Sequence, residues 1–291
     1  MTMSHAKSFF LLPGSMTLRF GSESGVLDEK AKILLKAYVP GITELLGSRA
    51  EVDIVIEHKE DTRMRIEERE NLITLHGPWG NNLLADLYHL IYAVVRVHLL
   101  KRKLFSVHSA CVLGEGGTTL LLGHSGSGKT SVALRLAEEH GMQIVAGNKT
   151  IVSFDEDVLR AVAGTTATSV RAVDGEKVGS DSFSYRDRHI SDSGLNGIFE
   201  KPVPIRSLAL VRLNDFTEEC TELKGPSALH SVFPYFLDTV NANVIFGDSV
   251  FVGTPPSGTE DFLAKQLLVG LRSIPVFSCI GSASFVAEQC K

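Results

Sequence analysis

The sequence predicts an α/β fold, with a larger core over residues 103–291 and a smaller α+β lobe over residues 1–102. Beyond residue 105, short apolar runs rich in β-branched residues alternate with stretches of helical periodicity, which is the pattern of an α/β domain. Before residue 100 the helical and alternating patterns are mixed. The chain has 291 residues, which is enough for two unequal domains.

Two helices and a small antiparallel sheet are expected in the N-terminal lobe. Apolar residues at helical spacing predict a helix over 28–38 and a long one over 82–101. Alternating apolar and polar residues predict a strand over 52–56. Two further alternating runs, 63–67 and 72–75, are joined by a charged turn and predict a hairpin.

In the C-terminal lobe, apolar runs and turn residues separate the expected elements. Strands are expected over 107–113, 118–122, 143–146, 150–154, 158–163, 207–213, 244–252 and 275–280, and helices over 129–139, 226–240 and 259–272. The stretch 174–204 is rich in Asp, Ser, Gly and Arg with little periodicity, and it predicts a long loop.

Charge and hydropathy argue against nucleic-acid and membrane partners. The net charge is −5, and the one basic cluster, Lys101 to Lys103, is explained by a helix C-terminus. The most apolar stretch, Leu83 to Leu100, contains charged and histidine residues that would be costly in hydrocarbon. Phe9 to Leu12 is too short for the core of a signal peptide.

The cysteine spacing points to neither a metal site nor a disulfide framework. No two of the four cysteines have C-x-x-C spacing, and none pairs with histidine in a metal-binding pattern. We therefore expect reduced thiols and a cytoplasmic protein. The cysteines are Cys111, Cys220, Cys279 and Cys290.

Residues 123–130 read GHSGSGKT, a full match to the phosphate-binding loop G-x-x-x-x-G-K-[ST]. An apolar strand precedes the match and a helical stretch comes after it, which is the context that the motif requires. Glycines let main-chain amides face phosphate oxygens, Lys129 neutralises the β and γ phosphates, and Thr130 offers a hydroxyl to Mg²⁺. The residues expected to hold a nucleoside triphosphate are Gly123, His124, Ser125, Gly126, Ser127, Gly128, Lys129, Thr130 and Ser131.

A histidine is expected beside this loop. The glycine-rich run 114–117 predicts a hairpin turn between the strands 107–113 and 118–122. If Leu113 pairs with Thr118, the register sets His108 opposite Gly123. The imidazole would then lie near the transferring phosphate.

These features resemble the kinase domain of HPr kinase/phosphorylase, whose P-loop core is related to that of phosphoenolpyruvate carboxykinase. The likeness rests on His108, the loop 123–130, Gly141 and the strand 144–146, with a weaker echo over 194–211. The resemblance implies a P-loop kinase core and transfer of the γ-phosphoryl group of ATP, with Mg²⁺, to a hydroxyl. The acceptor would be a Ser or Thr of a peptide or protein, or a small molecule. A homo-oligomer is compatible with the sequence.

One departure from the family pattern affects the chemistry. The family usually places two adjacent aspartates after the strand that ends here at Ala146, whereas this chain has Gly147-Asn148-Lys149. Asn148 can offer its amide oxygen to Mg²⁺, but it cannot act as a base at neutral pH. The candidate catalytic residues are therefore His108, Lys129 and Asn148, and the candidate metal ligands are Thr130 and Asn148.

Three interpretations of this loss stay open. In the first, the base comes from elsewhere in the chain, since phosphoryl transfer depends mainly on positioning and charge stabilisation. The candidates are Asp155, Glu156, Asp157, Asp181, Asp187 and His108. Alternatively, the chain binds a nucleotide and regulates without transfer. A third interpretation is different chemistry on the same scaffold, although no convincing set of residues for a carboxykinase-like lyase is present.

Overall fold

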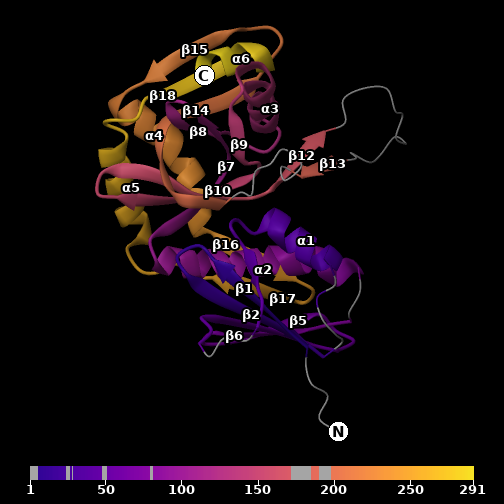
Figure 1. Ribbon diagram of the computed structural model, residues 1–291. Coiled ribbons are helices and arrows are strands. Elements are labelled where there is room, and N and C mark those ends of the chain that lie inside the picture. Colours follow the sequence, from indigo (N-terminus) through magenta and orange to yellow (C-terminus); the bar gives the residue numbers. More distant parts are fainter. Residues whose placement is uncertain are drawn as a thin grey trace. The chain divides into compact units, whose positions relative to one another are not determined.

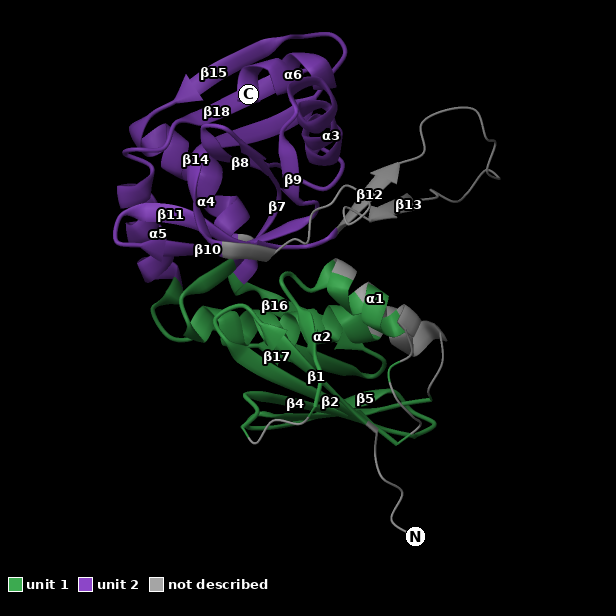
Figure 2. Cartoon of the chain, in the orientation of Figure 1, with its two compact units in different colours: residues 1–105, 240–259 green, residues 106–239, 260–291 purple. Residues whose placement is uncertain are grey.

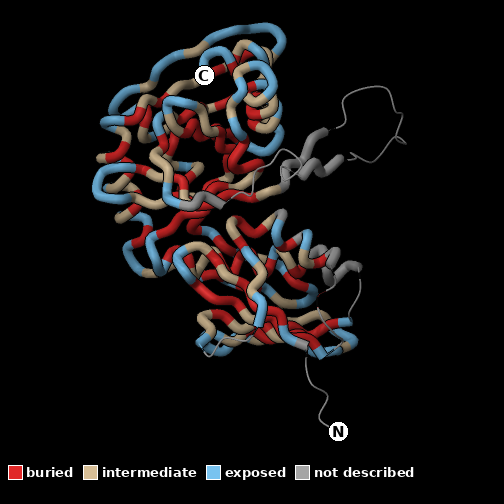
Figure 3. Tube along the Cα trace, in the orientation of Figure 1, coloured by how far each residue is buried: buried red, intermediate tan, exposed pale blue. Residues whose placement is uncertain are grey.

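The computed structural model shows a mixed α/β chain (Figure 1). It describes residues 6–23, 27, 29–47, 51–78, 81–171, 185–189 and 198–291. The chain divides into two compact units, the first formed by 1–105 with 240–259 and the second by 106–239 with 260–291 (Figure 2). In each unit the buried residues concentrate along the strands and the helix faces that cover them (Figure 3).

The first unit contains a six-stranded sheet in the order β3-β1-β2-β4-β6-β5. The strands are β1 Ala6–Leu12, β2 Met16–Ser22, β3 Thr43–Leu45, β4 Ile54–Lys59, β5 Arg65–Arg69 and β6 Leu72–His76. The β5–β6 hairpin is antiparallel as expected, but β2 pairs parallel with β4, and β4 with β6. The expectation of an antiparallel sheet was therefore wrong. The helix α1 (Glu29–Tyr38) lies in the connection from β2 to β4, and it supplies the length that a parallel crossover needs.

The long helix expected over 82–101 is confirmed as α2 (Asn81–Lys101). The apolar residues whose spacing predicted it are buried, among them Leu87, Leu90, Ile91 and Val94. Among the described residues, none of the helices combines the length and the apolar character that crossing a membrane requires.

The first stretch of the first unit ends at residue 105, close to the expected boundary at 102/103, but residues 240–259 also join this unit, which was not expected. The expected single strand 244–252 is instead a hairpin of β16 (Ala242–Phe246) and β17 (Ser249–Gly253). Gly247 makes the turn with a φ of 57°. The hairpin packs on α2 so closely that a Cβ at Gly253 would come within 2.8 Å of Val97. Burial of this hairpin against a helix far away in the sequence cannot be read from local periodicity.

The second unit contains an eight-stranded sheet in the order β11-β10-β7-β8-β14-β18-β15, with β9 paired to β7. The strands are β7 Leu104–Gly114, β8 Gly117–Leu122, β9 Gln143–Ala146, β10 Lys149–Asp155, β11 Val158–Gly164, β14 Ile198–Leu213, β15 Glu219–Leu223 and β18 Val276–Gly281. The strand β14 runs parallel to both β8 and β18. It is longer than expected, because its first half pairs with β11 and its second half with β8.

Helices α3 (Lys129–His140) and α6 (Ala283–Cys290) contact each other and share one apolar core with this sheet. The core includes Ala110, Val112, Leu121, Val132, Leu136, Val211, Cys279 and Val286. Successive strand residues point to opposite faces, so Leu210 and Ser278 face away from this core. The helices α4 (Gly225–Leu237) and α5 (Thr259–Gly270) also belong to the second unit.

The segment 174–204, expected to be a loop, contains the strand β13 (Tyr185–His189) and the start of β14. β13 pairs antiparallel with β12 (Ala167–Arg171), which lies just before that segment. Only Tyr185 in β13 has a clear preference for strands, so the pairing with β12, and not the local composition, accounts for this strand. The glycine-containing echo of the family pattern at 194–197 lies outside the described residues.

A disulfide joins Cys220 of β15 to Cys279 of β18, whereas reduced thiols were expected at all four positions. The two residues are 59 positions apart in sequence but are direct cross-strand partners. Sequence spacing could not show this, because it depends on the pairing of β15, a strand that periodicity did not reveal. Cys111 and Cys290 are free and buried. The expectation of a cytoplasmic location rested on reduced thiols, and the disulfide removes that support.

Candidate active site

The candidate site lies at one edge of the sheet in the second unit. Strand β7 is antiparallel to both β8 and β9, so these two strands run in the same direction and end at the same edge. The loop that begins at Gly123 comes directly after β8, and Gly147-Asn148 comes directly after β9. The end of β14 lies on the other side of β8, where the Leu213 amide donates to the carbonyl oxygen of Ser127 at 2.9 Å.

The expected hairpin and its register are confirmed. Leu113 pairs with Thr118 and Ser109 with Leu122, and Gly114 pairs with Gly117 across a two-residue turn. Continuing this register by one residue places His108 beside Gly123. His108 and the phosphate-binding motif therefore occupy neighbouring strands at the same edge.

At two glycines of the loop, close packing leaves no room for a Cβ. Gly128 has a φ of 101° and directly precedes α3, and a Cβ there would collide with the side chain of Leu213. Gly123 has a φ of 152°, and a Cβ there would meet the Ser127 hydroxyl and come within 2.8 Å of the Val211 carbonyl oxygen. The residue types at these positions are thus required by close backbone packing.

The side chain of Lys129 folds back over the loop. Its ammonium donates hydrogen bonds to the carbonyl oxygens of Gly123 at 2.8 Å and of His124 at 3.0 Å. The residue is only 7% exposed, and this burial lowers its pKa to about 8. A buried ammonium held by neutral carbonyls is a poorly compensated cation, so an incoming anion would be favourable here.

Other loop residues also have spare hydrogen-bonding capacity. The Ser127 hydroxyl is buried and has no hydrogen-bond partner among the described residues. His124, Ser125 and Gly126 are exposed, and Thr130 is half-buried in the first turn of α3. An orphan hydroxyl, a buried ammonium and the free amides of a helix N-terminus fit a phosphate group.

Basic groups surround His108. Burial lowers its pKa to about 4, and the nearby charges of Lys129, Lys149 and His124 also act to lower it. Among the described residues, the side chains whose charge shifts the pKa of His108 all belong to basic residues. The imidazole is neutral at pH 7, and the site around it has a positive potential that attracts anions.

Asn148 is pinned between two strands by main-chain hydrogen bonds. The main-chain amide of Asn148 donates to the Thr165 hydroxyl at 3.1 Å, and the main-chain carbonyl oxygen of Asn148 accepts from the main-chain amide of Ser109 at 3.1 Å. The backbone of the fully buried Thr165 also bonds to Gly147 and Lys149. Only the pairing of distant strands shows that Thr165 positions Asn148.

The acidic run Asp155-Glu156-Asp157 does not reach this site. It forms the turn of the β10–β11 hairpin, at the opposite end of β10 from Asn148 and roughly 20 Å away along an extended strand. Asp181 lies outside the described residues, as does the side chain of Asp187. No cluster of three or more His, Cys, Asp or Glu that could hold a metal occurs among the described residues. Thr130 and Asn148 therefore remain the candidate oxygen ligands for Mg²⁺.

A cavity of about 760 Å³ opens beside the loop on the β14 and β18 side. The loop residues 124–127 form one wall, and His230, Ser231, Pro234 and Tyr235 of α4 form another. The rings of His124 and Tyr235 lie 5.3 Å apart between centroids, with their planes inclined by 50°. Burial raises the pKa of the Tyr235 phenol, which therefore stays protonated at neutral pH.

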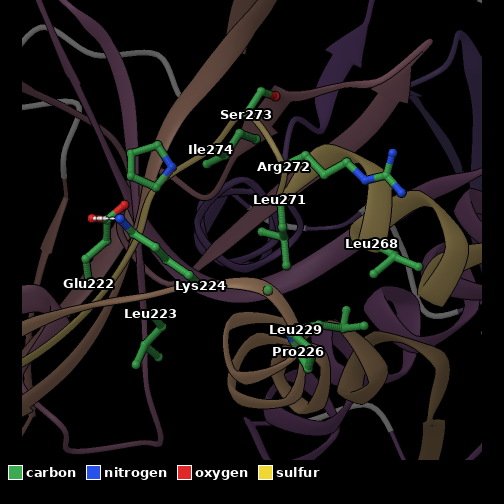
Figure 4. Close-up of a pocket in the computed structure, with 12 residues that line it drawn as sticks. Glu222, Leu223, Lys224, Pro226, Leu229, Leu268, Leu271, Arg272, Ser273 and Ile274 are labelled. Atoms are coloured by element: carbon green, nitrogen blue, oxygen red, sulfur yellow. Dashed lines mark ion pairs between the residues drawn. The ribbon is translucent and has the colours of Figure 1, made fainter.

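A second cavity of about 570 Å³ lies between the start of α4 and the segment that comes after α5. Figure 4 shows Glu222 and Lys224 joined by an ion pair, and the apolar side chains of Leu229, Leu268 and Leu271 away from that pair. None of the residues that line this cavity belongs to the phosphate-binding motif.

A scan of the chain against protein-family models finds no match, and a search of curated proteins finds none either.

Proposed function

We propose that the chain is an ATP- and Mg²⁺-dependent P-loop kinase of the HPr-kinase-like type, which transfers the γ-phosphoryl group to a hydroxyl. The acceptor is a Ser or Thr of a peptide or protein, or a small molecule. The observation that carries the proposal is the placement of Lys129 and His108. Both lie at the glycine loop, and the charged groups of the described residues that shift the pKa of His108 belong to the basic residues Lys129, Lys149 and His124.

In this proposal the loop amides and Lys129 hold the triphosphate, and Lys129 exchanges its bonds to the loop carbonyls for bonds to phosphate oxygens. Thr130 and Asn148 would supply oxygen ligands to Mg²⁺, which when bound neutralises charge on the β and γ phosphates. The imidazole of His108 is neutral at pH 7, and the negative charge of bound phosphates would raise its pKa from about 4, so that it could accept a proton from the acceptor hydroxyl.

A second function, nucleotide-dependent regulation without transfer, is favoured by Asn148. An amide replaces the carboxylate at the position where the related kinases have an acid. No carboxylate of the described residues adds an electrostatic effect to the pKa of His108. Both functions require a nucleoside triphosphate in the loop and differ only in whether phosphoryl transfer occurs after the nucleotide has bound.

Incubation with γ-labelled ATP, Mg²⁺ and panels of peptides, proteins and small alcohols separates the two. Transfer of label to an acceptor by the wild type, and not by His108→Gln, supports the kinase. Tight ATP binding with no labelled product across the panels supports the regulator. Normal ATP binding by Lys129→Ala would contradict both.

A further inference from the structure

We propose that the cavity between the loop and α4 holds the nucleoside portion of the triphosphate, with Tyr235 as the stacking surface for the base. This inference rests on the proposed function, because it assigns the opposite end of the same ligand. It also predicts that the site discriminates weakly between adenine and guanine.

The position of the cavity relative to the loop supports this assignment. The loop begins at the end of β8, which lies between β7 and β14 in the sheet. His108 and Asn148 lie on the β7 side, whereas the cavity is lined by residues of β14 and β18 on the other side. A triphosphate that crosses the loop with its terminal phosphate near His108 would direct its nucleoside toward β14.

The size and the lining of the cavity fit a nucleoside. Its volume of about 760 Å³ lies within the range of about 300–1,000 Å³ that is usual for small-molecule sites. Tyr235 and His124 present aromatic rings next to the loop. Hydroxyls of Ser231 and Ser278 supply polar groups for a ribose.

A proline in α4 adds a hydrogen-bond acceptor to this wall. Pro234 lies inside the helix and has no amide hydrogen, so the carbonyl of His230 lacks its usual helical donor. Both residues line the cavity. This carbonyl can accept from an amino group of a base.

No carboxylate occurs among the described residues that line the cavity. Strong selection of guanine would need an acceptor pair for its ring N–H and its exocyclic amine, and a carboxylate provides one. Stacking accepts any base, because every base has a π-face. We therefore expect ATP and GTP to bind with similar affinity.

Isothermal titration calorimetry with non-hydrolysable ATP and GTP analogues and with inorganic tripolyphosphate tests the inference. Tyr235→Ala should weaken both nucleotide analogues by about tenfold or more, as loss of stacking predicts, and should leave tripolyphosphate affinity within about twofold. Tyr235→Phe should behave like the wild type. Phe216→Ala removes a 95% exposed aromatic outside the cavity, and it is the matched control that should change nothing.

The outcomes distinguish failure of this inference from failure of the proposed function. Wild-type protein that binds neither tripolyphosphate nor nucleotide would remove both. If the wild type binds both and Tyr235→Ala weakens neither analogue, or weakens tripolyphosphate equally, the nucleoside assignment alone is wrong. A preference above about a hundredfold for one base would overturn the weak discrimination.

Discussion

The ammonium of Lys129 lies 2.8 Å from the carbonyl oxygen of Gly123, six residues earlier in the same loop. Both acceptors of this ammonium, the carbonyl oxygens of Gly123 and His124, belong to the loop itself. Lys129 is therefore placed to exchange a neutral acceptor for an anionic one, and an anionic acceptor forms the stronger hydrogen bond. The burial that lowers its pKa makes this exchange more favourable.

Lys129→Ala should abolish measurable ATP binding, because it removes the buried charge that faces the phosphates. In the wild type, binding at a pH above the Lys129 pKa of about 8 should also be coupled to proton uptake, because bound phosphates would raise that pKa. Calorimetry in buffers of different ionisation enthalpy measures the protons taken up. Lys224→Ala is the control, since Lys224 lies outside the loop and pairs with Glu222.

Gly128→Ala should lower the free energy of unfolding by about 2 kcal/mol or more, because its φ of 101° and the nearby Leu213 side chain both disfavour a Cβ. ATP affinity should fall in parallel. Urea unfolding measures the first effect and titration the second. Gly116→Ala in the β7–β8 turn is the matched control, because a Cβ there meets nothing within 4 Å and should leave the free energy of unfolding nearly unchanged. Equal stability of the two variants would show that Leu213 yields easily.

His108 should make the protein less stable in acid. Its pKa is about 4 in the folded state against 6.5 for the free side chain, so the unfolded chain binds the proton first as pH falls. The stability present above pH 6.5 is lost progressively down to about pH 4, by roughly 1–3 kcal/mol after allowance for solvent screening. His108→Gln should lack this part of the pH dependence.

Urea unfolding at several pH values between about 4 and 6.5, the two pKa values of His108, checks this slope. His98 also has a pKa lowered to about 4 by burial, so His108→Gln should keep the acid sensitivity due to His98. The reductions in the slope of stability against pH should therefore be additive when His108→Gln and His98→Gln are combined in a double variant. An unchanged slope in His108→Gln would mean that the imidazole is well solvated in the folded state.

Reduction of the disulfide between Cys220 and Cys279 should lower the free energy of unfolding by about 2–4 kcal/mol, since the bond closes a loop of 59 residues. Denaturant unfolding with and without dithiothreitol measures the difference. Cys220→Ala should be insensitive to the reductant, whereas Cys111→Ala should keep the sensitivity of the wild type. Equal unfolding of oxidised and reduced wild-type protein would contradict the bond.

Local patterns were sufficient for the elements that position the loop. A turn rich in glycine between two β-branched runs specifies the hairpin of β7 and β8, and this hairpin sets the register of His108. Helical periodicity after Lys129 was equally clear. Both signals lie within short stretches of chain, where pattern and geometry agree.

Long-range pairing accounts for the features that the sequence could not show. Thr165 anchors Asn148 through bonds across 17 residues, and β15 exists because it pairs with β18. The β16–β17 hairpin joins the first unit because it packs on α2. In the sequence, however, α2 and this hairpin are separated by every strand of the second unit's sheet except β18. Such contacts leave no periodic signal in either partner.

The amino-acid sequence by itself determined the phosphate-binding motif, the helix directly after it and the histidine beside it, because each depends on neighbours a few residues away. The tertiary structure alone decided the parallel pairings of the first sheet, the cavity against α4 and the gathering of Lys129, Lys149 and His124 around His108. These depend on which distant strands and helices meet, and that is decided by burial of apolar surface over the whole chain.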